Sequence, residues 1–128
     1  MTKPLICFDV DGTLLTKEMD NEGEYVKGII PTELLIDLWK QGFHIAIVSP
    51  SPFLPRQFSG DNHWFKEYGS NEYRWKNVDN AIDFYKTNRF NCIYVDDLEA
   101  NRKQLEKLDV ISYSPEKFLR TFATRCDP

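Results

Sequence analysis

Residues 8–15 read FDVDGTLL and set two carboxylates, Asp9 and Asp11, at the end of a short apolar run. Asp-Gly is a common way to leave a strand, so an ordinary turn explains Asp11 and the Gly12 that follows it. A turn does not explain Asp9, which lies inside the apolar run. A carboxylate beside a buried strand is costly unless it is paired or bound to a cation. The rest of the chain has to distinguish a plain turn from a functional site.

Apolar runs and amphipathic segments alternate along the chain. We expect strands at residues 5–10, 43–49, 91–97 and 110–113, with a further strand near 70–75. We expect helices at residues 31–42, 78–88, 98–108 and 115–123. The leucines of the third helix that we expect to face inward are Leu98, Leu105 and Leu108. Residues 16–30 are polar and contain glycine, which predicts a loop or a small hairpin.

This alternation predicts βαβ units and a parallel sheet. We therefore expect an α/β fold, three-layered and Rossmann-like, whose parallel sheet carries helices on both faces, as a single domain of residues 1–128. In such sheets, ligands bind beyond the carboxyl ends of the strands. The polar residues that end the expected strands would then share one edge of the sheet. They are Asp9, Asp11, Ser49, Asp96 and Asp97.

Charge and hydropathy limit the function classes. The net charge of −4 argues against a broad electrostatic grip on nucleic acid and leaves room only for a local basic groove. No apolar stretch approaches the roughly 20 residues that span a bilayer, and the amino-terminal run is too short for a signal peptide. We therefore expect a cytoplasmic protein with no membrane partner. Cys7 and Cys92 fall in apolar strand-like runs, and we interpret both as reduced core residues.

The acids at the expected sheet edge indicate a kind of chemistry. Asp9, Asp11, Asp96 and Asp97 would repel one another unless a cation neutralises them. Hard oxygen ligands with no nearby His or Cys suit Mg²⁺, which also binds substrate phosphates. One carboxylate can attack phosphorus to form an aspartyl-phosphate, and a neighbouring one can move protons to and from oxygen. Acids, a hydroxyl and a lysine together therefore suggest phosphoryl transfer.

The same stretches resemble the motifs of a known family over nearly the whole chain. FDVDGTLL matches the D-x-D-G-T-L signature of the haloacid dehalogenase-like (HAD) hydrolases. HIAIVS resembles their second motif, an apolar strand that ends in Ser or Thr. We match this hydroxyl residue to Ser49, and Ser51 is its competitor. YVDDLEAN resembles the fourth motif. The third motif is a lysine ahead of the fourth; we match it to Lys76, and Lys66 and Lys86 are its rivals.

The resemblance implies a role for each matched residue. Asp9 would be the nucleophile and a Mg²⁺ ligand, and Asp11 the general acid/base with its backbone carbonyl on the metal. Asp96, with Asp97 through water, would complete the metal site. The residues implied in phosphate binding are Gly12, Thr13, Ser49 and Lys76. The serine would orient the phosphoryl group and the lysine would stabilise its charge; many members have proline after this lysine, where this chain has Asn77.

The resemblance therefore implies a Mg²⁺-dependent phosphatase that hydrolyses a phosphate monoester through an aspartyl-phosphate. The alternatives are a phosphotransferase with the same intermediate and a non-catalytic HAD-like binding or regulatory module. A two-component receiver domain is disfavoured, because its phospho-accepting strand would have to follow the acid pair Asp96–Asp97, and only 31 residues follow Asp97. Residues 16–30 and 50–75 are too short for a full cap domain, so we expect a capless core with an exposed site. Such a core would act as a monomer or homodimer on a phosphorylated substrate.

Overall fold

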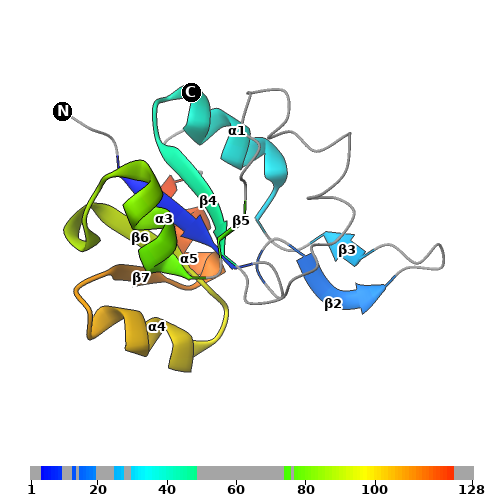
Figure 1. Cartoon of the computed structure of the whole chain (residues 1–128). Helices are drawn as coiled ribbons and strands as arrows, with labels where there is room; N and C mark the ends of the chain where they lie inside the picture. Colours follow the sequence, from blue (N-terminus) through cyan, green and yellow to red (C-terminus); the bar gives the residue numbers. More distant parts are fainter. Residues whose placement is uncertain are drawn as a thin grey trace.

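The computed structural model describes residues 4–9, 13, 15–19, 25–27, 30–48, 74–75 and 77–122. Its main element is a five-stranded sheet in which every neighbouring pair is parallel (Figure 1). The strands of this sheet are β1 (Leu5–Phe8), β4 (His44–Val48), β5 (Arg74–Trp75), β6 (Cys92–Val95) and β7 (Ile111–Tyr113). The antiparallel strands β2 (Leu15–Met19) and β3 (Tyr25–Lys27) form a separate hairpin, on the side toward which the arrows of β1 and β4 point in Figure 1. Of the loop or small hairpin expected at residues 16–30, the antiparallel pairing of β2 with β3 confirms the hairpin.

Helices connect the strands of the parallel sheet. They are α1 (Thr32–Lys40), α3 (Val78–Tyr85), α4 (Glu99–Glu106) and α5 (Pro115–Phe122), with a short 3₁₀ helix, η2 (Arg89–Asn91), before β6. Each α-helix lies within a range expected from the sequence and begins or ends one to three residues inside it. Within the described part of the chain, no helix combines the length and the apolar character needed to cross a membrane.

The order of the sheet is β5-β4-β1-β6-β7, with β1 in the middle. Numbered in chain order within this sheet, the strands lie 3-2-1-4-5, the order of a Rossmann-like doubly wound sheet. Each residue of β1 is level with one residue of β4 and one of β6; Phe8 pairs with Ile47 and Val95. The α/β class and the parallel sheet are therefore confirmed. The strand expected near 70–75 is also confirmed, as β5, the two-residue edge strand next to β4.

A first hydrophobic cluster joins the sheet to α1 and α5. Its buried members are Ile6, Phe8, Ile30, Leu34, Leu35, Leu38, Ile45, Ile47, Ile93, Val95, Phe118 and Phe122. The rings of Phe8 and Phe118 meet edge to face with centroids 5.2 Å apart, a favoured aromatic arrangement. Phe118 also stacks on Phe122. The apolar side of α5 therefore packs against β1 through the fully buried ring of Phe118.

A second cluster takes the alternate strand residues and joins them to α3. Its buried members are Leu5, Cys7, Ala46, Val48, Val78, Ala81, Ile82, Cys92, Tyr94 and Val110. Successive strand residues point to opposite faces, which is why neighbours in sequence fall into different clusters. Cys7 and Cys92 are free, buried thiols with Sγ atoms 3.8 Å apart, as expected of reduced core cysteines. Burial raises the pKa of Cys7, and its contact with Cys92 raises it further, so this thiol stays protonated.

The expected packing of the third helix was wrong at two of its three leucines. Leu98 is 49% exposed and Leu108 is 42% exposed, whereas Leu105 packs partly buried against the second cluster. The reason is the length of the helix. Because α4 begins at Glu99 and ends at Glu106, both exposed leucines lie outside it, and helical periodicity does not govern where they point.

Replacing Phe118 with alanine tests the first cluster. We expect Phe118→Ala to lower the free energy of unfolding by about 3–5 kcal/mol, because it removes a fully buried ring and leaves a cavity. The matched control is Phe90→Ala, at a ring that is 76% exposed, which should cost less than about 0.5 kcal/mol. Urea unfolding of both variants measures the difference. Equal losses would contradict the packing of Phe118 in the first cluster.

Candidate functional site

Three aspartates meet where two paired strands end. Asp9 directly follows β1, and Asp96 and Asp97 directly follow β6. Because the strands are parallel and Phe8 is level with Val95, the residues that follow leave the same edge of the sheet together. The Asp9 N–H donates to the Val95 carbonyl at 3.0 Å and continues the ladder by one bond. One carboxylate oxygen from each aspartate lies within 4.8 Å of the others.

The aspartate cluster lies at the switch point of the sheet. After β1 the chain adds β4 and then β5 on one side, and it returns to place β6 on the other side of β1. The boundary between β1 and β6 is therefore the place where the direction of winding reverses. In open α/β sheets, ligands bind in the crevice at this point, beyond the carboxyl ends of the strands.

The three carboxylates differ in exposure. Asp96 is completely buried, Asp9 is partly buried and Asp97 is exposed. A buried carboxylate requires hydrogen-bond donors, and Asp96 has them. Its Oδ1 accepts the backbone N–H of Leu98 at 2.9 Å, and its Oδ2 accepts the side-chain amide of Asn101 at 2.9 Å and the hydroxyl of Tyr94.

Three donors to Asp96 come from residues that sequence reasoning missed. Tyr94 is on β6 two residues before Asp96, and Asn101 is on α4 five residues after it. A third, Arg102, donates from its guanidinium to the backbone carbonyl of Asp96 at 2.8 Å. The period of two along a strand was the available signal for Tyr94, because it places this side chain on the same face as Asp96. No comparable pattern identifies the two α4 residues before the turn geometry is known.

The hydroxyl of Tyr94 is held in its protonated form. Burial raises its pKa well above the ordinary range, and the hydrogen bond to Asp96 with the negative charges of Asp96 and Asp9 raises it further. Tyr94 therefore acts as a hydrogen-bond donor toward Asp96 at any ordinary pH.

The donor set of the cluster suits a hard cation. It offers one oxygen from each of three carboxylates and, among the described residues, no histidine or thiol belongs to it. Oxygen ligands of this kind are those of Mg²⁺ and Ca²⁺, whereas Zn²⁺ sites are commonly built from His and Cys. The three aspartates are therefore chemically able to hold a divalent cation.

The other site residues expected from the sequence divide into two groups. Thr13 is described and fully buried: its backbone carbonyl accepts the N–H of Ile30 at 3.3 Å, and its hydroxyl has no hydrogen-bond partner in the described part of the chain. The remaining ones lie outside the described residues, and their roles stay predictions. They are Asp11, Gly12, Ser49 and Lys76.

The strand pairing bears on two of these predictions. Val48, which precedes Ser49 in the chain, is level with Trp75, which precedes Lys76. Both strands run in the same direction as β1 and β6, toward the edge where the aspartates meet. Val48 and Trp75, the residues just before Ser49 and Lys76, are thus level with each other at the ends of two paired strands.

Of the two rival lysines, Lys86 is placed by the structure and Lys66 lies outside the described residues. Lys86 is exposed, follows the last turn of α3 and adopts a left-handed conformation with φ 54°. The segment from Lys86 leads into the first residue of β6, so it lies at the amino end of the parallel strands. The aspartates lie at the carboxyl end, and Lys86 is therefore not near them.

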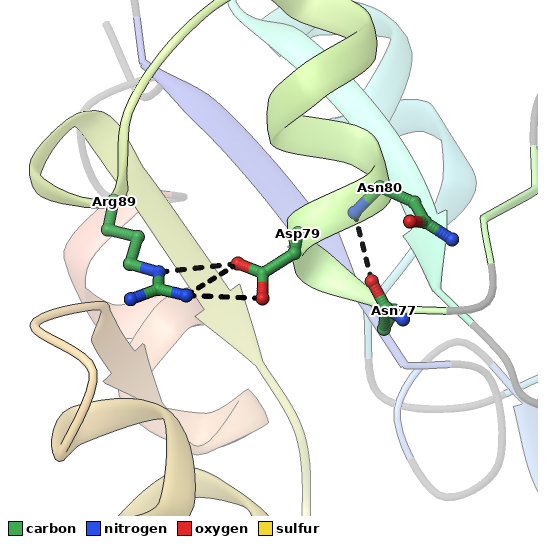
Figure 2. A network of polar contacts seen from close by, with 4 residues as sticks. All are labelled: Asn77, Asp79, Asn80 and Arg89. Carbon is green, nitrogen blue, oxygen red and sulfur yellow. Dashed lines mark hydrogen bonds and ion pairs between the residues drawn. The ribbon is translucent and has the colours of Figure 1, made fainter.

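Asn77 fixes where α3 begins, one residue after Lys76. Figure 2 shows its side-chain oxygen accepting the N–H of Asn80 at 2.9 Å, an N-cap of the usual kind. Two residues after Asn77, Asp79 forms a bidentate ion pair with Arg89 of η2, with N···O distances of 3.2–3.3 Å (Figure 2). This exposed pair links the first turn of α3 to the segment that leads into β6, and exposed pairs of this kind contribute little stability.

The comparisons with known proteins bear on the fold. No protein-family model matches the chain, and no curated protein matches it. Among solved structures, the chain is similar to a crystal structure of a hypothetical protein from Xanthomonas campestris, with a TM-score of 0.59 and 21% sequence identity. The likeness covers 88% of this chain and 63% of the other, so the chain spans less than two thirds of that protein's length. At this identity the likeness shows a shared fold.

Removing the cap of α3 tests how its start is fixed. We expect Asn77→Ala to lower the free energy of unfolding by about 1 kcal/mol, because the N–H of Asn80 loses its acceptor. Asn77→Asp keeps an acceptor and adds a charge that suits the helix N-terminus, so its loss should stay within a few tenths of a kcal/mol. Urea unfolding compares the two. Equal destabilisation by both variants would show that this side chain does not set the start of α3.

Proposed function

We propose that this chain is a HAD-like, Mg²⁺-dependent phosphohydrolase that cleaves a phosphate monoester through an aspartyl-phosphate on Asp9. The observation that carries the proposal is the meeting of Asp9 with Asp96 and Asp97, whose carboxylate oxygens lie within 4.8 Å of one another. These residues come from the two stretches that resemble the first and fourth HAD motifs, which lie far apart in the chain. Their place at the switch point of a parallel sheet is where such folds bind ligands.

The proposal includes the finer fold assignment. We propose the three-layer HAD-like arrangement, with helices on both faces of the sheet. It is supported by the two hydrophobic clusters, one joining alternate strand residues to α1 and α5 and the other joining the remaining strand residues to α3. The expected absence of a full cap concerns residues 16–30 and 50–75, most of which lie outside the described residues, and it stays a prediction.

The residues that would hold the cation are Asp9, Asp96 and Asp97. An all-carboxylate set of few ligands suits Mg²⁺, which keeps several waters and is completed by a substrate phosphate. When bound, Mg²⁺ would neutralise negative charge on the phosphoryl oxygens and on the aspartates. The partial burial of Asp9 and the full burial of Asp96 favour such a cation, because charge interactions strengthen away from water.

The chemical steps follow from the protein's own residues. The carboxylate of Asp9 attacks phosphorus, the bond from phosphorus to the ester oxygen breaks, and that oxygen receives a proton from the carboxyl of Asp11 and leaves as the alcohol. Water then attacks the phosphorus of the aspartyl-phosphate while Asp11 takes a proton from it. The bond from phosphorus to Asp9 breaks, which releases inorganic phosphate and restores the free carboxylate.

The phosphate-binding roles remain those that the family resemblance implies. Ser49 would orient the phosphoryl group, and Lys76 would stabilise its charge. Gly12 and Thr13 follow Asp11 directly, and a glycine here would allow backbone N–H groups to face the phosphate. The substrate class is a phosphate monoester, and the proposed setting is the cytoplasm.

Turnover of an aryl phosphate tests the proposed chemistry. We expect hydrolysis that requires Mg²⁺, stops with EDTA, and falls by roughly 10³-fold or more in Asp9→Asn, because the nucleophile is lost. The matched control is Asp83→Asn, an exposed aspartate of α3, which should retain wild-type activity. Release of inorganic phosphate is the measurement, and adding an alcohol acceptor distinguishes a phosphotransferase from a hydrolase.

A second readout covers an enzyme that refuses the aryl surrogate. Beryllofluoride mimics a phosphoryl group on an aspartate, and wild-type protein with Mg²⁺ should bind it whereas Asp9→Asn should not. A panel of phosphorylated metabolites and phosphopeptides extends the activity measurement. No Mg²⁺-dependent turnover on the panel together with no beryllofluoride adduct would overturn the proposal and leave a binding module.

A further inference from the structure

Tyr94 is close to the aspartate cluster, on one of the two strands that lead into it. It is on β6, two residues before Asp96, and therefore on the same face of the strand. The register places Tyr94 level with Cys7 of β1, and Asp9 follows two residues further along that face. The residue is only 7% exposed and belongs to the second cluster, so the ring is fixed by packing while its hydroxyl reaches Asp96.

The hydrogen bonds of Asp96 are unequally divided between its two oxygens. Oδ2 accepts from both the Tyr94 hydroxyl and the Asn101 amide, and this fills the two lone-pair positions of a carboxylate oxygen. Within the described part of the chain, Oδ1 accepts one hydrogen bond, from the N–H of Leu98. The carboxylate is thus held through both oxygens, and Oδ1, with one hydrogen bond from the described residues, keeps a lone pair for a cation.

We propose that Tyr94, acting together with Asn101, is a positioning residue that makes Asp96 bind the divalent cation through Oδ1 alone. Donors behind a ligating group fix its orientation, and their loss commonly weakens metal affinity by about 10–100-fold. Without the Tyr94 hydroxyl, Oδ2 of a buried carboxylate would lose a charge-assisted donor, and the group would be free to turn. A turned carboxylate would no longer present Oδ1 to the cation. The inference rests on the cation site of the proposed function and not on the hydrolysis itself.

The test compares two tyrosines, Tyr94 in the second cluster and Tyr85 packed against it. Tyr94→Phe removes the hydroxyl that reaches Asp96, whereas Tyr85→Phe removes a hydroxyl that donates to the backbone carbonyl of Ile45 at 3.3 Å. Mn²⁺ serves as the probe, because its binding is measured directly by electron paramagnetic resonance, and Mg²⁺ is measured by competition. We expect Tyr94→Phe to raise the Mn²⁺ dissociation constant about 10–100-fold and Tyr85→Phe to leave it within twofold.

The outcomes separate this inference from the proposed function. Equal Mn²⁺ affinity in wild type and Tyr94→Phe would overturn the positioning role. A wild-type protein that binds no Mn²⁺ would overturn both the cation site and this inference. Weakened Mn²⁺ binding by Tyr94→Phe in a protein that hydrolyses no phosphate ester would sustain the positioning role and count against the phosphatase alone.

A second variant guards against a simple loss of folding. Far-ultraviolet circular dichroism and urea unfolding in EDTA establish whether Tyr94→Phe is folded without metal. If it is not, Asn101→Ala removes the other donor from Oδ2 and carries the same expectation of weakened Mn²⁺ binding. Its control is Gln104→Ala, an exposed position of the same helix that should leave Mn²⁺ affinity unchanged. Unchanged affinity in Asn101→Ala would then overturn the proposal.

Discussion

The parallel pairing of β1 with both of its neighbours is the constraint on which the rest of the structure depends. Because β1 is bonded to β4 on one side and to β6 on the other, its register sets the level of every residue that follows these strands. A slip of one residue would turn Asp9 to the opposite face and move each core side chain of β1 into the wrong cluster. The aspartate cluster and the two hydrophobic clusters are therefore consequences of a single register.

Burial of the Asp96 carboxylate is tolerated because strand, turn and helix all donate to it. A charge taken out of water is costly, and here it is met by a side chain of β6, a backbone N–H of the turn and a side chain of α4. Arg102 adds a bond to the backbone carbonyl of the same residue. The residue proposed as a cation ligand thus also ties α4 to the sheet, and its environment serves both folding and chemistry.

Much of this arrangement follows from sequence patterns alone, and the rest needed the strand order. Continuous apolar runs that end in acids predicted β1 and β6, and the parallel sheet then brought Asp9 and Asp96 to one edge. Leu98 and Leu108 were assigned wrongly because the sequence does not show that α4 begins at Glu99 and ends at Glu106. Lys86 could be separated from the aspartates only when the sheet showed which end of β6 it precedes. The contact between Tyr94 and Asp96 depends on side-chain reach, which spacing does not reveal.

The buried thiols of Cys7 and Cys92 give this fold a built-in reporter. They come from β1 and β6, the two paired strands that lead into the aspartates, and their sulfur atoms lie 3.8 Å apart across this strand pair. An alkylating reagent reaches either sulfur only when the strands part or the helices over them lift away. The labelling rates at these two positions, resolved by peptide mass, therefore measure how often the structure around the β1–β6 strand pair opens in the native protein. No probe has to be introduced for that purpose.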